Sequence, residues 1–317
     1  MNVSDDALRT IVAHFATLRA SWGEVLGAAD LVEPNGEYFP DEFALEPAAI
    51  DRLMRRMMSY APLSEDLDVA LAFVEPEGEN GTKAGGSCGS GACGTGAEKG
   101  APAILGGGAV ETDDGYAVPL ATADVGDPTL LTTSLARSMG RLVLHECGEE
   151  VDPRDEAAVA EITAVACGFG VLLLNGACVY KKGCGGMRMH QGTVLDVHEL
   201  ALATALFLRV NDVKAGLVKR HLEVTQREAF DEALAFVDGQ PKLVATLREH
   251  PEALTDGVFA LEEKKGLLAK LFARKPDDGL EALAAAAPRS TPRPMSDAER
   301  RRLAETKALV EEALQES

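Results

Sequence analysis

The stretch DPTLLTTSLARSMGRLVL, residues 127–144, opens the part of the chain that decides the fold. Its first aspartate can cap a helix and the proline after it suits a first helical turn, so we expect a helix that ends near Gly148. A second helix is expected over residues 154–178, around the run ITAVACGFGVLLL at 162–174. Because this second helix is apolar along nearly its whole length, it should lie in the middle of the core.

Further elements are predicted on both sides of these two helices. Apolar residues recur at helical spacing in the segments before and after these two helices. A Gly-rich turn, KKGCGG, follows the second helix. A short strand is expected at 68–74, and a strand pair within 108–122 turns at Asp113-Asp114-Gly115. The remaining helices are expected at about 4–27, 46–60, 196–209, 211–222, 226–236 and 240–249.

The composition agrees with a mainly helical fold. Hydrophobic residues make up 46% of the chain, which is enough for a sizeable core, but aromatic residues make up only 5%. Alanine and leucine are abundant, which favours helices packed through small and aliphatic side chains over a β-sandwich. We therefore expect a mainly α protein with a small β-hairpin and short strands before the 127–144 helix.

The chain divides by composition into one domain and a tail. Residues 1–250 are expected to form a helical domain, interrupted by a flexible Gly-rich loop at 83–107. A short basic amphipathic helical segment is expected at 251–274. An alanine run and four prolines then indicate a linker over 275–294, and residues 295–317 are predicted to form a solvated helix.

The charge of the chain limits the partners it can have. Lys and Arg total 31 against 51 Asp and Glu, a formal net charge of -20. Such a field repels nucleic acids and anionic membrane surfaces, so a protein partner is expected to be basic or apolar. The alternative is that the charge only keeps the protein soluble. The oligomeric state does not follow from the sequence.

Location is predicted from the first residues and the most apolar run. MNVSDDALRT begins with acids, where an export signal has a basic region. The run at 162–174 is too short to span a bilayer and is expected to be a buried helix. A cytoplasmic protein is therefore predicted, in which the six cysteines do not form a disulfide framework.

Three quoted motifs together resemble an uncharacterised group of bacterial zincin-like proteins. The 127–144 stretch is similar to that group's motif helix, D-P-x-x-L-x-A-T-L-A-H-E-L-x-H. EITAVACGFGVLLLNGA at 161–177 is similar to its core helix, T-D-L-x-A-V-F-L-G-F-G-I-F-x-A-N. HQGTVLDVHELALATALFLR at 190–209 is similar to a Q-G-Y-L turn followed by a helix rich in A-x-x-L-A-L. The resemblance covers about residues 108–238 and implies a helical zincin-like core.

The resemblance also implies that the metal ligands have been replaced. In an HExxH helix two histidines at i and i+4 bind zinc, and the glutamate between them is the general base. Placed on this sequence, those three positions hold Arg137, Ser138 and Arg141, and the carboxylate of the following helix is Glu161. Arginine does not lose its proton in proteins, so it cannot bind zinc. Zinc-dependent hydrolysis at this site is then lost.

The replaced residues predict an ion pair. A buried carboxylate needs a charge partner or a proton. We therefore expect Glu161 to pair with Arg137 or Arg141, whose guanidinium groups would supply the positive charge of the missing metal. The alternative is that both arginines face solvent.

Two other groups of residues are alternative metal sites. His145 and Glu149 could bind a metal together with Glu161, although Gly148 should end the helix before Glu149. The alternative role for His145 is a favourable interaction with the helix dipole near the C-terminal end. Cys147 could also serve as a ligand in such a metal site.

The cysteines form the second alternative. Cys88 and Cys93 lie in the Gly-rich loop, and Cys178 and Cys184 bracket the KKGCGG turn. Four thiolates could bind zinc if the loop folds onto the turn, but the spacings are wider than in the usual short pairs. A redox pair of Cys88 and Cys93 is another interpretation. Otherwise Cys178 is a core residue and the loop cysteines have no joint role.

The sequence thus favours a non-catalytic pseudo-peptidase that serves as a protein-binding or scaffold module, with no cofactor. One alternative is a metal-dependent hydrolase with a rearranged zinc site at His145 or at the cysteines. Another is a structural or regulatory subunit that docks through its C-terminal helices into a larger assembly.

Overall fold

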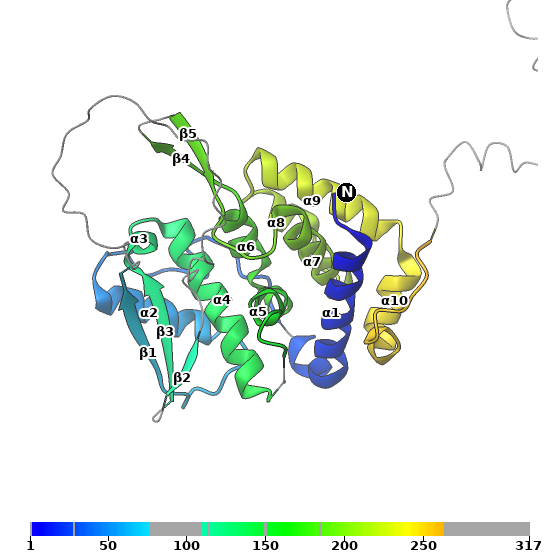
Figure 1. The fold of residues 1–317 in the computed structure, drawn as a ribbon, viewed down its shortest axis with the longest axis horizontal. Coiled ribbons are helices and arrows are strands. Elements are labelled where there is room, and N and C mark those ends of the chain that lie inside the picture. Colours follow the sequence, from blue (N-terminus) through cyan, green and yellow to red (C-terminus); the bar gives the residue numbers. More distant parts are fainter. Residues whose placement is uncertain are drawn as a thin grey trace, which may run out of the picture. The chain divides into compact units, whose positions relative to one another are not determined.

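Two buried helical stretches form the centre of the fold (Figure 1). The computed structural model describes residues 2–27, 29–75, 109–112, 115–148, 151–183 and 186–262. These belong to one compact unit, residues 1–262. The first central helix, α4 (Pro128–Glu146), begins where the side chain of Asp127 accepts hydrogen bonds from the amides of Thr129 and Leu130. The predicted start and end of this helix are confirmed.

The second stretch is not the continuous helix that the sequence predicts. It consists of α5 (Glu156–Ala164), a π-helical turn at Val165–Phe169 and α6 (Gly170–Ala177). Within the turn Gly168 has a φ of 95°, and its carbonyl accepts a hydrogen bond from the amide of Val32. A Cβ on Gly168 would overlap the carbonyl oxygen of Asp30. The interruption therefore arises where the backbone before Val32 approaches the helix, a contact that the local sequence does not reveal.

The other helices surround this pair. α7 packs against α6 and α9, and α1 packs against α7 and α5. One predicted helix, over 211–222, was wrong in length, because Asp212 takes a left-handed conformation with a φ of 55° and only a short helix follows. The remaining helices and helical turns are α1 (Asp5–Leu26), α2 (Pro47–Met58), α3 (Thr122–Val125), α7 (Val197–Val210), α8 (Ala215–Lys219), α9 (Val224–Asp238), α10 (Pro241–Glu249) and a 3₁₀ turn at Pro251–Leu254.

A three-stranded sheet lies beside α4 (Figure 1). Its central strand is β3 (Gly115–Ala121), which pairs in parallel with β1 (Val69–Val74) and antiparallel with β2 (Val110–Thr112). The predicted strand and strand pair are therefore confirmed. The side chains of Val118 and Leu120 on β3 are buried against the helices. The fold is thus mainly helical, with a few short strands before the central helices.

A second sheet was not predicted. Where the sequence indicates only a Gly-rich turn, β4 (Val179–Gly183) and β5 (Gly186–His190) form an antiparallel hairpin that projects from the helices (Figure 1). Of the KKGCGG residues that the structure describes, Gly183 ends β4 and Gly186 begins β5. Such short strands carry too few alternating positions to be recognised by periodicity.

Several sequence predictions lie outside the described residues. They are the Gly-rich loop at 83–107, the two aspartates of the Asp113-Asp114-Gly115 turn, the linker at 275–294 and the C-terminal helix at 295–317. Of the helical segment predicted at 251–274, the structure describes residues 251–262. There the prediction was wrong, because irregular backbone follows the 3₁₀ turn at Pro251–Leu254.

One described helical stretch, Glu156–Ala177, is long and apolar enough by length and composition to cross a membrane. The run at 162–174 is too short to span a bilayer, but the helical stretch that contains it is longer. Within this structure 89% of its apolar window is buried among the other elements. Core helices of soluble proteins pass the same test of length and composition. In this fold the stretch belongs to the core.

The close packing of α4 on α5 generates the first prediction. A Cβ on Gly140 would overlap the carbonyl oxygen of Ala160 and crowd the amide of Ala164. Although alanine favours helices over glycine by about 1 kcal/mol, we expect Gly140→Ala to lower the free energy of unfolding by about 1–3 kcal/mol through overpacking. Urea denaturation measures this change.

Gly216 on α8 is the matched control, because the space around its Cβ position is open. Gly216→Ala should be neutral or slightly stabilising. Equal effects of the two substitutions would contradict the proposed close contact between α4 and α5.

Candidate functional site

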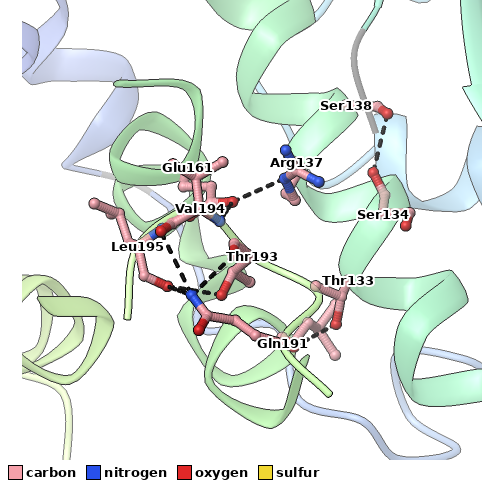
Figure 2. Close-up of polar contacts among 10 residues, drawn as sticks. Thr133, Ser134, Arg137, Ser138, Glu161, Gln191, Thr193, Val194 and Leu195 are labelled. Carbon is pink, nitrogen blue, oxygen red and sulfur yellow. Dashed lines mark hydrogen bonds and ion pairs between the residues drawn. The ribbon is translucent and has the colours of Figure 1, made fainter. Parts of the chain in front are cut away.

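Glu161 lies at the middle of the core with 0% of its surface exposed. Its Oε1 atom is 2.8 Å from Nε of Arg137 and accepts a hydrogen bond of 2.7 Å from the amide of Val194. Its Oε2 atom accepts a hydrogen bond of 2.8 Å from the amide of Leu195. Figure 2 shows these groups converging on the carboxylate from α4 and from the loop before α7. We call Glu161, Arg137 and these two amides the Glu161 centre.

The two amides are held in place by the loop at residues 191–195. Gln191 donates from Nε2 to the carbonyls of Thr193, at 3.0 Å, and Leu195, at 3.3 Å. The hydroxyl of Thr193 also donates to the Leu195 carbonyl, at 2.7 Å. At the start of the loop, the amide of Gly192 donates to the carbonyl of Gly176 on α6. These bonds turn the loop so that its amides face the Glu161 carboxylate (Figure 2).

Helix α7 begins directly after this loop. Asp196 accepts hydrogen bonds from the amides of His198 and Glu199, and Glu199 accepts one from the amide of Asp196. This reciprocal capping box satisfies donors at the start of the helix. The helix start therefore fixes the end of the loop that binds Glu161.

Arg137 and Ser138 occupy different surroundings on α4. Arg137 is buried and faces Glu161, as the sequence predicts for one of its two candidate arginines. Ser138 is also buried, but its hydroxyl donates to the carbonyl of Ser134 at 3.0 Å within the same helix (Figure 2). The hydroxyl proton is thus used within α4, and Ser138 offers no carboxylate of the kind that serves as general base in an HExxH helix.

Arg141 has a different partner from Arg137. It lies one turn further along α4 and pairs with Glu156 at 2.6 Å, in a position that is partly exposed. His145, another turn along, has Nε2 at 3.9 Å from the same carboxylate and its ring 5.8 Å from that of Tyr116. The predicted ion pair is therefore confirmed for Arg137, while Arg141 neither pairs with Glu161 nor simply faces solvent.

Burial and attraction act in opposite directions on the Glu161 centre. Burial raises the pKa of the Glu161 carboxyl, whereas Arg137 and the two amides lower it. Burial likewise lowers the pKa of Arg137, and the Glu161 charge raises it. Burial is the larger effect for both groups, so the pKa of Glu161 is raised and that of Arg137 is lowered. A guanidinium nevertheless keeps its proton in proteins, and Nε of Arg137 lies 2.8 Å from Oε1 of Glu161. Such a pair needs good geometry and further hydrogen bonds to offset the cost of removing both charges from water.

The Glu161 centre does not suit a zinc ion. Three donors already surround the carboxylate, and the two residues at the histidine positions of the zincin-like pattern carry permanent positive charge. Within the ranges that the structure describes, no three His, Cys, Asp or Glu residues are grouped so that they could hold a metal.

The alternative site at His145 is not assembled around Glu161. His145 lies eight residues after Arg137 on α4, about 12 Å along the helix axis, and it is next to Glu156 instead. Glu149, the third residue of that alternative, lies outside the described residues. The described part of the chain thus does not bring His145 and Glu161 together.

The cysteines are only partly described. Cys178, at the end of α6, is buried, and its carbonyl accepts a hydrogen bond of 2.7 Å from Gln226. Cys167 is buried in the π-helical turn, and burial raises the pKa of its thiol. Cys88, Cys93 and Cys184 lie outside the described residues, so the proposed thiolate site remains a prediction.

Comparison of the chain with protein-family models, with curated proteins and with solved structures finds no match. The resemblance to zincin-like proteins therefore rests on the motifs quoted above. The structure places two of the residues picked out by those motifs, Arg137 and Glu161, in direct contact.

Sequence reasoning missed the two amides that complete the site. Backbone donors leave no residue signature, because every residue except proline carries one. The one available signal was the HQGTVLD segment at 190–196, which the resemblance includes but to which it gives no role. Its glutamine and threonine are the side chains that shape the 191–195 loop.

The Glu161 centre generates the second prediction. Glu161→Gln keeps the shape of the side chain but leaves the guanidinium of Arg137 buried beside a neutral group. We expect the free energy of unfolding to fall by about 3 kcal/mol or more, as measured by urea denaturation. The double variant Arg137→Met with Glu161→Gln should recover part of this loss, because no buried charge is then left unpaired.

Glu156→Gln is the control, because it removes the partner of Arg141 in a partly exposed pair. Its cost should stay below about 1 kcal/mol. A cost for Glu161→Gln no larger than that of the control would contradict the central role of the buried pair.

Proposed function

We propose that the chain is a non-catalytic, zincin-like helical protein that acts as a protein-binding or scaffold module. The observation that carries this proposal is the ion pair between Arg137 and Glu161. At these two positions the zincin-like pattern has a histidine ligand and a carboxylate. The pair supplies the charge that a metal would supply, without an open coordination position. A catalytic zinc needs such a position for its water or substrate.

The pair also suits a structural role. Through Glu161 it connects α4, α5 and the loop before α7, three segments that are distant in the sequence. A structural zinc ion joins segments in the same way. On this proposal the core has kept the joining role of a metal and lost the chemistry.

A surface suited to a partner lies between α2 and the start of α4. A groove of about 350 Å³ is lined by Phe39, Phe43 and Leu53. Glu42 and the ion pair between Arg56 and Asp41, at 2.8 Å, also lie in its wall. Phe43 is 44% exposed, and the neighbouring Leu45 is more exposed still. An apolar side chain next to a basic residue would fit the apolar lining and the carboxylate of Glu42. This agrees with the basic or apolar partner expected from the net charge.

The third prediction tests whether the Glu161 centre corresponds to the zinc site of the HExxH pattern. The full chain, purified without added metal, should contain no stoichiometric zinc by elemental mass spectrometry. The triple variant Arg137→His, Ser138→Glu and Arg141→His restores the HExxH pattern opposite Glu161, and we expect it to bind about one equivalent of zinc.

The same triple variant with Glu161→Gln is the control and should bind zinc more weakly, because it lacks the carboxylate ligand. Circular dichroism and thermal unfolding check that each variant is folded. About one equivalent of zinc in the wild-type chain would overturn the non-catalytic proposal. A folded triple variant that binds none would refute the alignment with the zincin-like pattern.

The fourth prediction tests the groove as a partner surface. Phe43→Ser should weaken the capture of a specific protein partner in pull-downs from the source cell by about tenfold, which corresponds to about 1.4 kcal/mol of binding. Phe73→Ser is the matched control, since Phe73 on β1 is 41% exposed but does not line the groove. Equal loss with both variants, or with neither, would count against the groove.

A further inference from the structure

We propose that a pocket at the base of the β4–β5 hairpin binds a free α-amino acid as its zwitterion. The pocket has a volume of about 580 Å³ and lies between the end of α6, the start of β4 and the start of α9. That volume is within the range of small-molecule sites. The proposal concerns residues outside the Glu161 centre and does not depend on the function proposed above. Its described lining includes Asn175, Cys178, Tyr180, His221, Glu223 and Gln226.

Gln226 supplies the first observation that points to a ligand. It is only 2% exposed, and its Nε2 atom donates to the carbonyl of Cys178 at 2.7 Å. Its buried Oε1 atom accepts no hydrogen bond from any residue that the structure describes. Gln226 lines the pocket, and its bond to Cys178 fixes the orientation of the amide, so Oε1 is left as an acceptor without a donor among the described residues. An ammonium group would supply that donor.

The start of α9 supplies the second observation. This helix has 15 residues, and Glu223 at its N-cap makes no capping hydrogen bond with its side chain. The first amides of the helix, from Val224 to Gln226, therefore lack both an intrahelical acceptor and a side-chain cap. All three residues line the pocket. Free amides and the positive end of the helix dipole together attract a carboxylate.

Charge decides between an anion and a zwitterion. Glu223 is exposed and lines the same pocket, so a ligand with only negative charge would meet a carboxylate beside the helix start. A ligand with only positive charge would meet the helix dipole instead. An α-amino acid carries both groups on neighbouring atoms, so its carboxylate can face the α9 amides while its ammonium faces Glu223 and Gln226.

A cluster around the buried carboxylate of Glu33 borders the pocket at His221. The carboxylate of Glu33 lies 2.8 Å from Nε2 of His221 and accepts a hydrogen bond of 2.8 Å from Nε of Arg220. A second nitrogen of the Arg220 guanidinium also contacts this carboxylate. The Glu33 charge is thereby neutralised, and the His221 ring is held in one orientation at the pocket. A wall fixed in this way favours a preformed site.

Ligand binding to the full chain tests the proposal. Each standard amino acid is screened at about 1 mM by saturation-transfer NMR, and each that binds is titrated by calorimetry. We expect at least one to bind, and its N-acetyl and carboxamide derivatives to bind at least about tenfold more weakly, because each lacks one of the two charges. Binding of no amino acid, or equal binding of the blocked derivatives, would overturn the proposal.

Two variants on α9 locate the site. Glu223→Gln removes the proposed ammonium partner at an exposed position and should weaken binding by about tenfold or more. Glu228→Gln removes the same charge from the same helix outside the pocket, and its affinity should match the wild type. Thermal unfolding confirms that both variants are folded. Wild-type affinity for Glu223→Gln, or equal loss with both variants, would place the amino acid elsewhere and overturn the assignment.

Discussion

The fully buried carboxylate of Glu161 constrains the rest of the structure. A buried charge of this kind persists only if donors surround it, and no single segment of the chain supplies enough of them. The donors come from α4 and from the loop before α7, while the carboxylate itself comes from α5. Three segments must therefore meet before the charge is satisfied. This requirement fixes the packing of α4 on α5 and the path of the chain into α7.

Small residues allow these segments to approach one another. Gly140 on α4 lies against the backbone of Ala160, next to Glu161, so the guanidinium of Arg137 one turn away comes within reach of the carboxylate. Gly176 on α6 lies against Thr133 of α4, whose hydroxyl donates to the carbonyl of Leu172. Larger side chains at the two glycines would separate the helices. The polar centre and the close helix packing thus depend on each other.

The buried centre and the candidate binding surfaces are separate features. The Glu161 carboxylate is surrounded by Arg137 and two backbone amides and offers no open position for a substrate. The groove beside α2 and the pocket beside α9 are formed by other residues, many of them on loops and helix ends. We propose that recognition takes place at such surfaces while the Glu161 centre holds the core. This division would allow the core to keep one arrangement while the surfaces bind partners.

The sequence by itself determined the helical class, the limits of α4 and the strands around β3, because these follow from capping residues and local periodicity. It also predicted an ion pair of Glu161 with Arg137 or Arg141, with the alternative that both arginines face solvent left open. Only the tertiary structure decided which arginine it is. It also revealed the π-helical turn at Gly168, the β4–β5 hairpin and the two amides that bind Glu161. These features depend on contacts between distant segments and on backbone groups common to nearly all residues, and neither leaves a local pattern in the sequence.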